Sequence, residues 1–171
     1  MLCLSSALSL AQSERREEKE EVGEPALVLE LGGAASRSIT ESVSSFGPSA
    51  SLEFEPIENK LEVEAGASSL FRRHATEWDT SLIFKKPWTL SDKTEFMLGG
   101  GPGWIYSRAY GEETRNSVGL EFEPEFMFWR SEKQRFGWYV EPSYEYNFAS
   151  HEHSIGITIG LLIGFHNKNS N

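Results

Sequence analysis

The feature that most constrains this chain is an alternation of apolar with polar or small residues that repeats with a period of two. Such alternation places successive side chains on opposite faces of an extended chain, so each segment predicts a β-strand with one apolar face. The sequence LEFEP, at 52–56 and again at 120–124, shows the pattern most clearly. No segment shows the 3.6-residue period of an amphipathic helix. The alternating segments are 27–31, 50–55, 61–68, 78–85, 94–99, 118–128, 136–145 and 155–165.

The connections between these eight segments differ in a regular way. Polar loops are expected at 34–47, 72–77, 107–116 and 149–153, and mostly tighter turns at 56–60, 86–92 and 130–135. Longer loops at one end and shorter turns at the other are typical of an up-and-down antiparallel meander. Eight strands are enough to close the sheet and remove its edges. The predicted fold class is therefore all-β, a closed eight-stranded antiparallel up-and-down β-barrel.

Two environments suit such a barrel. A soluble lipocalin-like carrier turns its apolar face inward, whereas a transmembrane barrel turns it toward lipid. Strand length, a second face rich in Gly, Ser, Thr and Glu, and aromatic residues near the strand ends favour the transmembrane barrel. These aromatic residues are Phe71, Trp78, Trp88, Trp104, Tyr106, Trp129, Tyr146 and Phe148.

Composition excludes several classes of protein. The 171 residues carry a net charge of −10, which disfavours nucleic acid as a partner. No apolar run approaches the roughly 18 residues that a membrane-spanning helix needs. Cys3 is the only cysteine, so a chain processed after it has no disulfide and no cysteine-based zinc site. We expect no cofactor and no bound metal.

The first residues predict export. LCLSSALSLA, at 2–11, is a short apolar run that ends in small residues and suits cleavage before Gln12. We therefore interpret 1–11 as the remnant of a signal peptide and 12–24 as a charged, flexible leader. The barrel is expected over 25–165, and a short tail over 166–171.

The last segment, SIGITIGLLIGF, alternates apolar residues and finishes on Phe165. In this it resembles the terminal strand of the small eight-stranded outer-membrane barrels of Gram-negative bacteria, the OmpA/OmpX-like group. The resemblance implies a monomer in the bacterial outer membrane that contacts outer-membrane lipid and lipopolysaccharide. It also implies that the barrel-assembly machinery recognises Phe165, that both termini are periplasmic and that the longer loops are outside. It carries no activity over to this chain.

If the apolar face meets lipid, the acidic residues of the strands point into the lumen. Few basic residues share that face, namely Lys85, Lys93 and Arg72. We favour a water-filled, hydrogen-bonded lumen; a lumen that attracts cations is a second interpretation, and catalytic carboxylate pairs are a third. The predicted acidic cluster comprises Glu53, Glu55, Glu62, Glu64, Glu121, Glu123, Glu125, Glu141 and Glu145, with Glu30, Asp79 and Glu95 on the same face.

The expected turns also predict which carboxylates oppose each other across neighbouring strands. The expected pairs are Glu55 with Glu62, Glu53 with Glu64, Glu125 with Glu141 and Glu121 with Glu145. Two prolines, Pro124 and Pro142, should meet in the same register and disturb strand pairing there, because a proline cannot donate to the ladder.

A second constellation is HEHS, at 151–154. His151, His153 and Ser154 are candidates for a hydrolytic site, because serine, histidine and a carboxylate act together in such sites. An outer-membrane lipid A deacylase uses these residue types on a similar barrel, but Ser154 follows His153 directly and does not reproduce its spacing. A solvated histidine pair is the interpretation we favour. The predicted function is thus a structural or surface-interaction role without enzymatic activity. The alternatives are a lipid-modifying hydrolase and a soluble lipocalin-like carrier of a small ligand.

Overall fold

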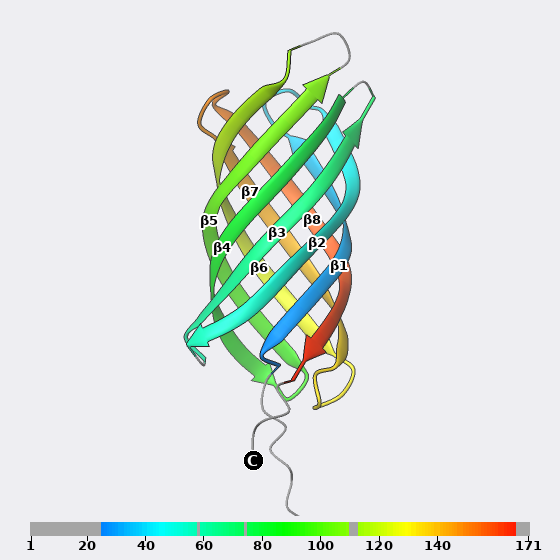
Figure 1. The fold of residues 1–171 in the computed structure, drawn as a ribbon, viewed down its shortest axis with the longest axis vertical. Coiled ribbons are helices and arrows are strands. Elements are labelled where there is room, and N and C mark those ends of the chain that lie inside the picture. The colour runs from blue at the N-terminus through cyan, green and yellow to red at the C-terminus, as the bar shows by residue number, and fades with distance from the viewer. Residues whose placement is uncertain (1–24, 58, 74, 110–112, 167–171) are drawn as a thin grey trace, which may run out of the picture.

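The chain forms one closed antiparallel barrel in which every strand pairs with its neighbours in sequence and β1 pairs with β8 (Figure 1). The computed structural model describes residues 25–57, 59–73, 75–109 and 113–166, so the expected signal peptide, leader and all but the first residue of the tail lie outside it. Among these residues no helix is long and apolar enough to cross a membrane. The strands are β1 (Leu27–Ser38), β2 (Ser44–Ile57), β3 (Leu61–Arg72), β4 (Ala75–Ser91), β5 (Thr94–Ala109), β6 (Arg115–Trp129), β7 (Phe136–Asn147) and β8 (Glu152–Phe165).

The strands are longer at one end than the sequence indicated. The expected loop at 34–47 shrinks to 39–43, because β1 continues to Ser38 and β2 begins at Ser44. Small residues such as Gly, Ala and Ser fill these extensions, so alternation of polarity is weak there. Pairing with the neighbouring strand extends β1, since Ala35 lies opposite Ile157 and Arg37 opposite Ile155 on β8.

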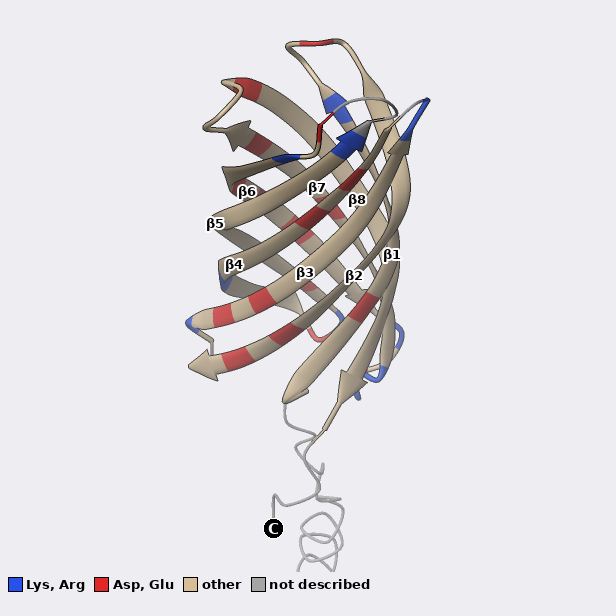
Figure 2. Cartoon of the chain, turned by 45° about the horizontal axis from the view of Figure 1, so that its top comes forward, with Lys and Arg blue, Asp and Glu red and all other residues tan. Residues whose placement is uncertain are grey.

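The apolar face points outward on all eight strands, as the transmembrane interpretation requires. Side chains such as Phe46, Ile159 and Leu161 expose 70%, 53% and 63% of their surface. The soluble lipocalin-like alternative needs these residues in the interior and is therefore wrong. Acidic positions lie along the strands, whereas most basic positions lie toward the two ends (Figure 2).

Aromatic side chains form two groups on the outer face, near the opposite ends of the barrel. Toward the chain termini, Trp88 stacks on Phe96 at 5.6 Å between ring centroids, and Phe128 on Trp138 at 4.2 Å. Toward the other end, the exposed rings belong to Phe46, Phe71, Trp78, Trp104, Tyr106, Tyr144 and Phe148. Two bands of this kind are typical of the interfacial girdles of membrane barrels.

Trp129 was expected in a girdle, and this prediction is wrong. It is the last residue of β6 and shares the inward face with Met127, so its indole is buried, with 4% exposed. The indole Nε1 donates to Glu95 Oε2 at 3.3 Å. Trp129 and five other inward side chains form a buried cluster, which we call the apolar block, in the half of the lumen nearer the chain termini. The other five are Val28, Met97, Met127, Tyr139 and Leu162.

Strand pairing is interrupted between β6 and β7, as the two prolines predicted. Paired positions stop at Phe122 and resume at Phe126. Pro124 lies inside this gap, and Pro142 lies in the facing part of β7. The missing proline N–H groups explain why the ladder is broken at this height.

Candidate functional site in the lumen

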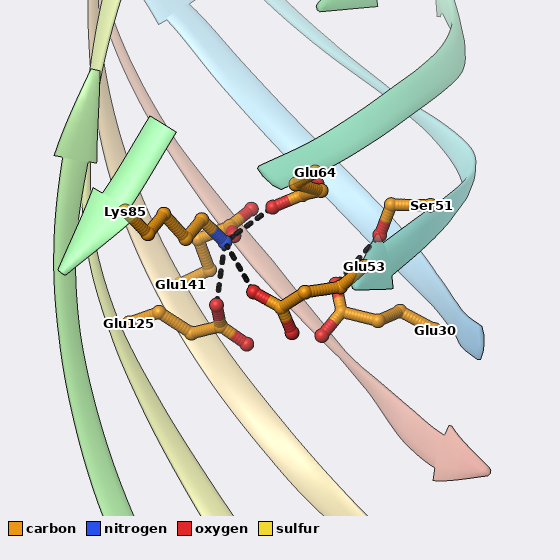
Figure 3. Close-up of polar contacts among 7 residues, drawn as sticks. All are labelled: Glu30, Ser51, Glu53, Glu64, Lys85, Glu125 and Glu141. Atoms are coloured by element: carbon orange, nitrogen blue, oxygen red, sulfur yellow. Dashed lines mark hydrogen bonds and ion pairs between the residues drawn. The ribbon is translucent and has the colours of Figure 1, made fainter. Parts of the chain in front are cut away.

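The centre of the lumen is organised around the ammonium group of Lys85, which is buried within the barrel. Lys85 Nζ lies 2.5 Å from Glu125 Oε2 and 2.9 Å from Glu141 Oε2, and it also contacts Glu64. A fourth carboxylate, Glu53, lies 4.0 Å away. Figure 3 shows that these side chains converge from different sides of the barrel on one ammonium group.

A fifth carboxylate completes the group that we call the Lys85 cluster: Lys85, Glu30, Glu53, Glu64, Glu125 and Glu141. Glu30 Oε2 accepts a hydrogen bond from Ser51 Oγ at 2.6 Å, and the whole Glu30 side chain is buried. The members come from six strands, β1 to β4, β6 and β7. Closure of the barrel is therefore what brings them together.

Local sequence makes room for the lysine stem. Gly99 on β5 lies opposite Lys85 on β4, and a Cβ atom at this glycine would lie 2.5 Å from Lys85 Cγ. Gly101 allows a second close approach, because a Cβ there would lie 2.0 Å from the Leu82 carbonyl oxygen. The glycine-rich segment GGGPGW, at 99–104, thus lies within β5 and permits close packing against β4.

Negative charge exceeds positive charge in this cluster. The cluster holds five carboxylates and one ammonium group, so it would carry a charge of −4 if all were ionised. Removing ions from water is costly unless they are paired. Several carboxylate oxygens nevertheless have no hydrogen-bond donor among the described residues, including both oxygens of Glu53, Glu30 Oε1 and Glu125 Oε1.

Three sets of these carboxylates are close enough to share a cation. Within each set, one oxygen per residue lies within 4.8 Å of the others. The sets are Glu30 with Glu125 and Glu141, Glu53 with Glu64 and Glu125, and Glu64 with Glu123 and Glu141.

Cavities extend from the Lys85 cluster toward the end opposite the termini. The first has a volume of about 80 Å³ and is lined by Glu64, Glu123 and Glu141 together with other polar residues. It shares Glu145 and Ser154 with a second small cavity. That cavity shares further lining residues with a vestibule of about 400 Å³ near the rim. Toward the chain termini, the lumen holds the apolar block and a smaller cavity of about 30 Å³.

All nine members of the predicted acidic cluster lie on the inward face, but the barrel divides them by height. Glu64, Glu121, Glu123, Glu141 and Glu145 line the 80 Å³ cavity. Glu53, Glu55 and Glu62 line a separate cavity toward the termini. The ninth member, Glu125, lies in the Lys85 cluster.

Two of the four expected carboxylate pairs are direct partners across neighbouring strands. Glu53 lies opposite Glu64, and Glu121 opposite Glu145, as the turns predicted. The register of β2 with β3 shifts after Phe54, so Glu55 is not in the regular ladder. The remaining pair, Glu125 and Glu141, falls in the gap between β6 and β7 and meets through Lys85.

The two other basic candidates for the lumen lie elsewhere. Lys93 lies exposed in the turn between β4 and β5, so its assignment to the lumen is wrong. Arg72, at the end of β3, lines the vestibule, and its Nη1 atom lies 3.8 Å from Glu41 Oε2. Of the three basic candidates, only Lys85 contacts the predicted acidic cluster. The sequence placed Lys85 on the inward face but did not reveal which carboxylates it contacts.

The structure separates the hydrolytic candidates. His151 and His153 are exposed, and their Nδ1 atoms lie 2.8 Å and 2.7 Å from the hydroxyls of Tyr146 and Tyr144. Ser154 points the other way and lines the lumen. The described histidines and the serine therefore do not share one face. Phe165 ends β8, with 48% of its side chain exposed on the outer face opposite Leu27.

This architecture is that of the small eight-stranded outer-membrane barrels. Neisserial surface protein A superposes with a TM-score of 0.69 at 13% identity, covering 84% of this chain and 99% of that protein. The outer membrane protein OprG of Pseudomonas aeruginosa gives 0.65 at 12% identity, covering 85% and 99%. Ail, the attachment invasion locus protein of Yersinia pestis, gives 0.57 at 17%, covering 84% and 100%. No protein-family model and no curated protein matches the chain.

Proposed function

We propose that this protein is a monomeric barrel of the bacterial outer membrane that has a structural or surface-interaction role. The observation that carries the proposal is the outer face, which is apolar on all eight strands and bounded by two aromatic bands. Such a face favours contact with lipid, since soluble monomers rarely expose large apolar patches and membrane barrels carry an outward apolar band. The likeness of the fold to outer membrane protein OprG supports the same location.

The interior supports a role at the surface in preference to transport. The apolar block lies in the half of the lumen nearer the chain termini, beside a cavity of only about 30 Å³. Met97 of this block lies opposite Glu125 of the Lys85 cluster. A solute that entered at the rim would meet buried side chains before it reached the other end. The rim itself offers a polar vestibule of about 400 Å³ whose lining includes Glu41, Arg72 and Glu113.

Membrane placement is tested by fractionation and gel migration. We expect the protein in the outer-membrane fraction, released only by detergent, and we expect the unheated sample to migrate differently from the boiled one. Recovery in the aqueous fraction without detergent would refute the proposal.

The closed lumen is tested by conductance in planar bilayers, with a general porin as the conducting control. We expect no steady conductance from the folded protein. A stable open level would show that the apolar block does not seal the lumen and would favour transport.

A further inference from the structure

The carboxylates at the base of the 80 Å³ cavity form a compact oxygen-rich site. Glu64, Glu123 and Glu141 each offer one oxygen, and these three oxygens lie within 4.8 Å of one another. Their side chains are buried, with residue exposures of 4%, 4% and 6%, and all three line the cavity. They reach this point from β3, β6 and β7, so the site exists only in the closed barrel.

Glu123 supplies an independent indication that a ligand belongs here. Lys85 contacts Glu64 and Glu141, but none of its ion pairs involves Glu123. Glu123 Oε2 is fully buried and has no hydrogen-bond donor among the described residues. A buried acceptor of this kind costs about 1–3 kcal/mol, and more when charged, unless a partner satisfies it.

We propose that Glu64, Glu123 and Glu141 bind a hard divalent cation, Ca²⁺ or Mg²⁺. All three protein ligands are carboxylate oxygens, which these ions prefer, and the set contains no imidazole or thiolate to favour zinc. Such ions need six or more oxygen ligands, so water completes the shell. The cavity has room for several water molecules, since one needs about 10–15 Å³.

Access for the cation is from the rim. The vestibule shares Glu77 and Glu152 with the second cavity, and the second cavity shares Glu145 with the 80 Å³ cavity. This route is acidic and attracts cations. The proposed site is therefore reached only from the rim, which distinguishes it from a conducting pore.

The test is calorimetric titration of the detergent-folded protein with CaCl₂ and MgCl₂ at neutral pH. We expect one site per barrel with Kd of about 10⁻⁴–10⁻³ M, the range of extracellular calcium-binding modules. Glu123→Gln should weaken binding at least tenfold, because it replaces the one carboxylate of the set that Lys85 does not contact.

Asp79→Asn is the matched control. It removes the same charge from the same cavity, but Asp79 belongs to none of the three oxygen sets. We expect it to weaken binding less than threefold. Equal weakening by both variants would overturn the proposal, because it would indicate diffuse attraction by the acidic lumen.

Absence of binding by the wild-type protein up to about 10 mM of either ion, well above the expected Kd, would also overturn it. Each variant is first checked for folding by its heat-modifiable migration on a gel. If Glu123→Gln does not fold, Glu123→Asp replaces it. The shorter side chain keeps the charge but withdraws the oxygen, so binding should still weaken at least tenfold; unchanged affinity would overturn the proposal.

Discussion

Replacement of Lys85 by methionine tests the electrostatic balance of the lumen most directly. Methionine retains an unbranched stem beside Gly99 but removes the ammonium group that lies within 2.9 Å of Glu125 and Glu141. Loss of one partner from a buried ion pair costs about 3–5 kcal/mol, because the other charge remains buried and uncompensated. Here at least three carboxylates lose their contact, so we expect Lys85→Met to lower the free energy of unfolding by at least 3 kcal/mol, about the lower limit for one pair.

The measurement is urea-induced unfolding in lipid vesicles, followed by tryptophan fluorescence and by the fraction of heat-modifiable protein. Lys60→Met is the control, since Lys60 is exposed in the turn between β2 and β3 and should change stability by less than about 0.5 kcal/mol. Addition of Glu125→Gln to Lys85→Met should restore about 1–2 kcal/mol, because it removes one of the orphaned charges. Equal stability of Lys85→Met and wild type would refute the reasoning and show that the carboxylates do not depend on the ammonium group.

Three further predictions concern the outer face, the strand contacts and the histidine pair. Ile159→Arg, on the outer face near the middle of β8, should cost about 2–4 kcal/mol of unfolding free energy in vesicles, and an unchanged value would contradict contact with lipid. Gly101→Ala should reduce the folded fraction on a gel, because its Cβ would meet the Leu82 carbonyl, whereas Gly33→Ala, whose Cβ would have no neighbour closer than 3.9 Å, should not. Ser154→Ala should leave the lipid A mass spectrum of expressing cells unchanged, since the serine faces away from both histidines; a changed spectrum would revive the hydrolase interpretation.

The strands and their faces could be predicted from the sequence because both depend on a local property. A period of two fixes which side chains share a face, so residues such as Leu52 and Glu53 were assigned to opposite faces without knowledge of any partner strand. The same logic located the irregularity at Pro124, since proline removes a hydrogen-bond donor wherever it lies. It failed at 34–38 and 44–47, where small residues carry little polarity signal and the two segments extend the strands by pairing with each other and with β8.

The sequence by itself therefore determined that this chain has eight strands, each with an apolar face and an opposite face that carries most of the carboxylates. Only the tertiary structure decided which side chains of the acidic face meet. Closure of the barrel brings Lys85 to carboxylates from four other strands and packs Trp129 into the apolar block. The physical reason is that alternation acts between neighbouring residues, whereas the position of a charge in the lumen depends on register summed around the whole barrel.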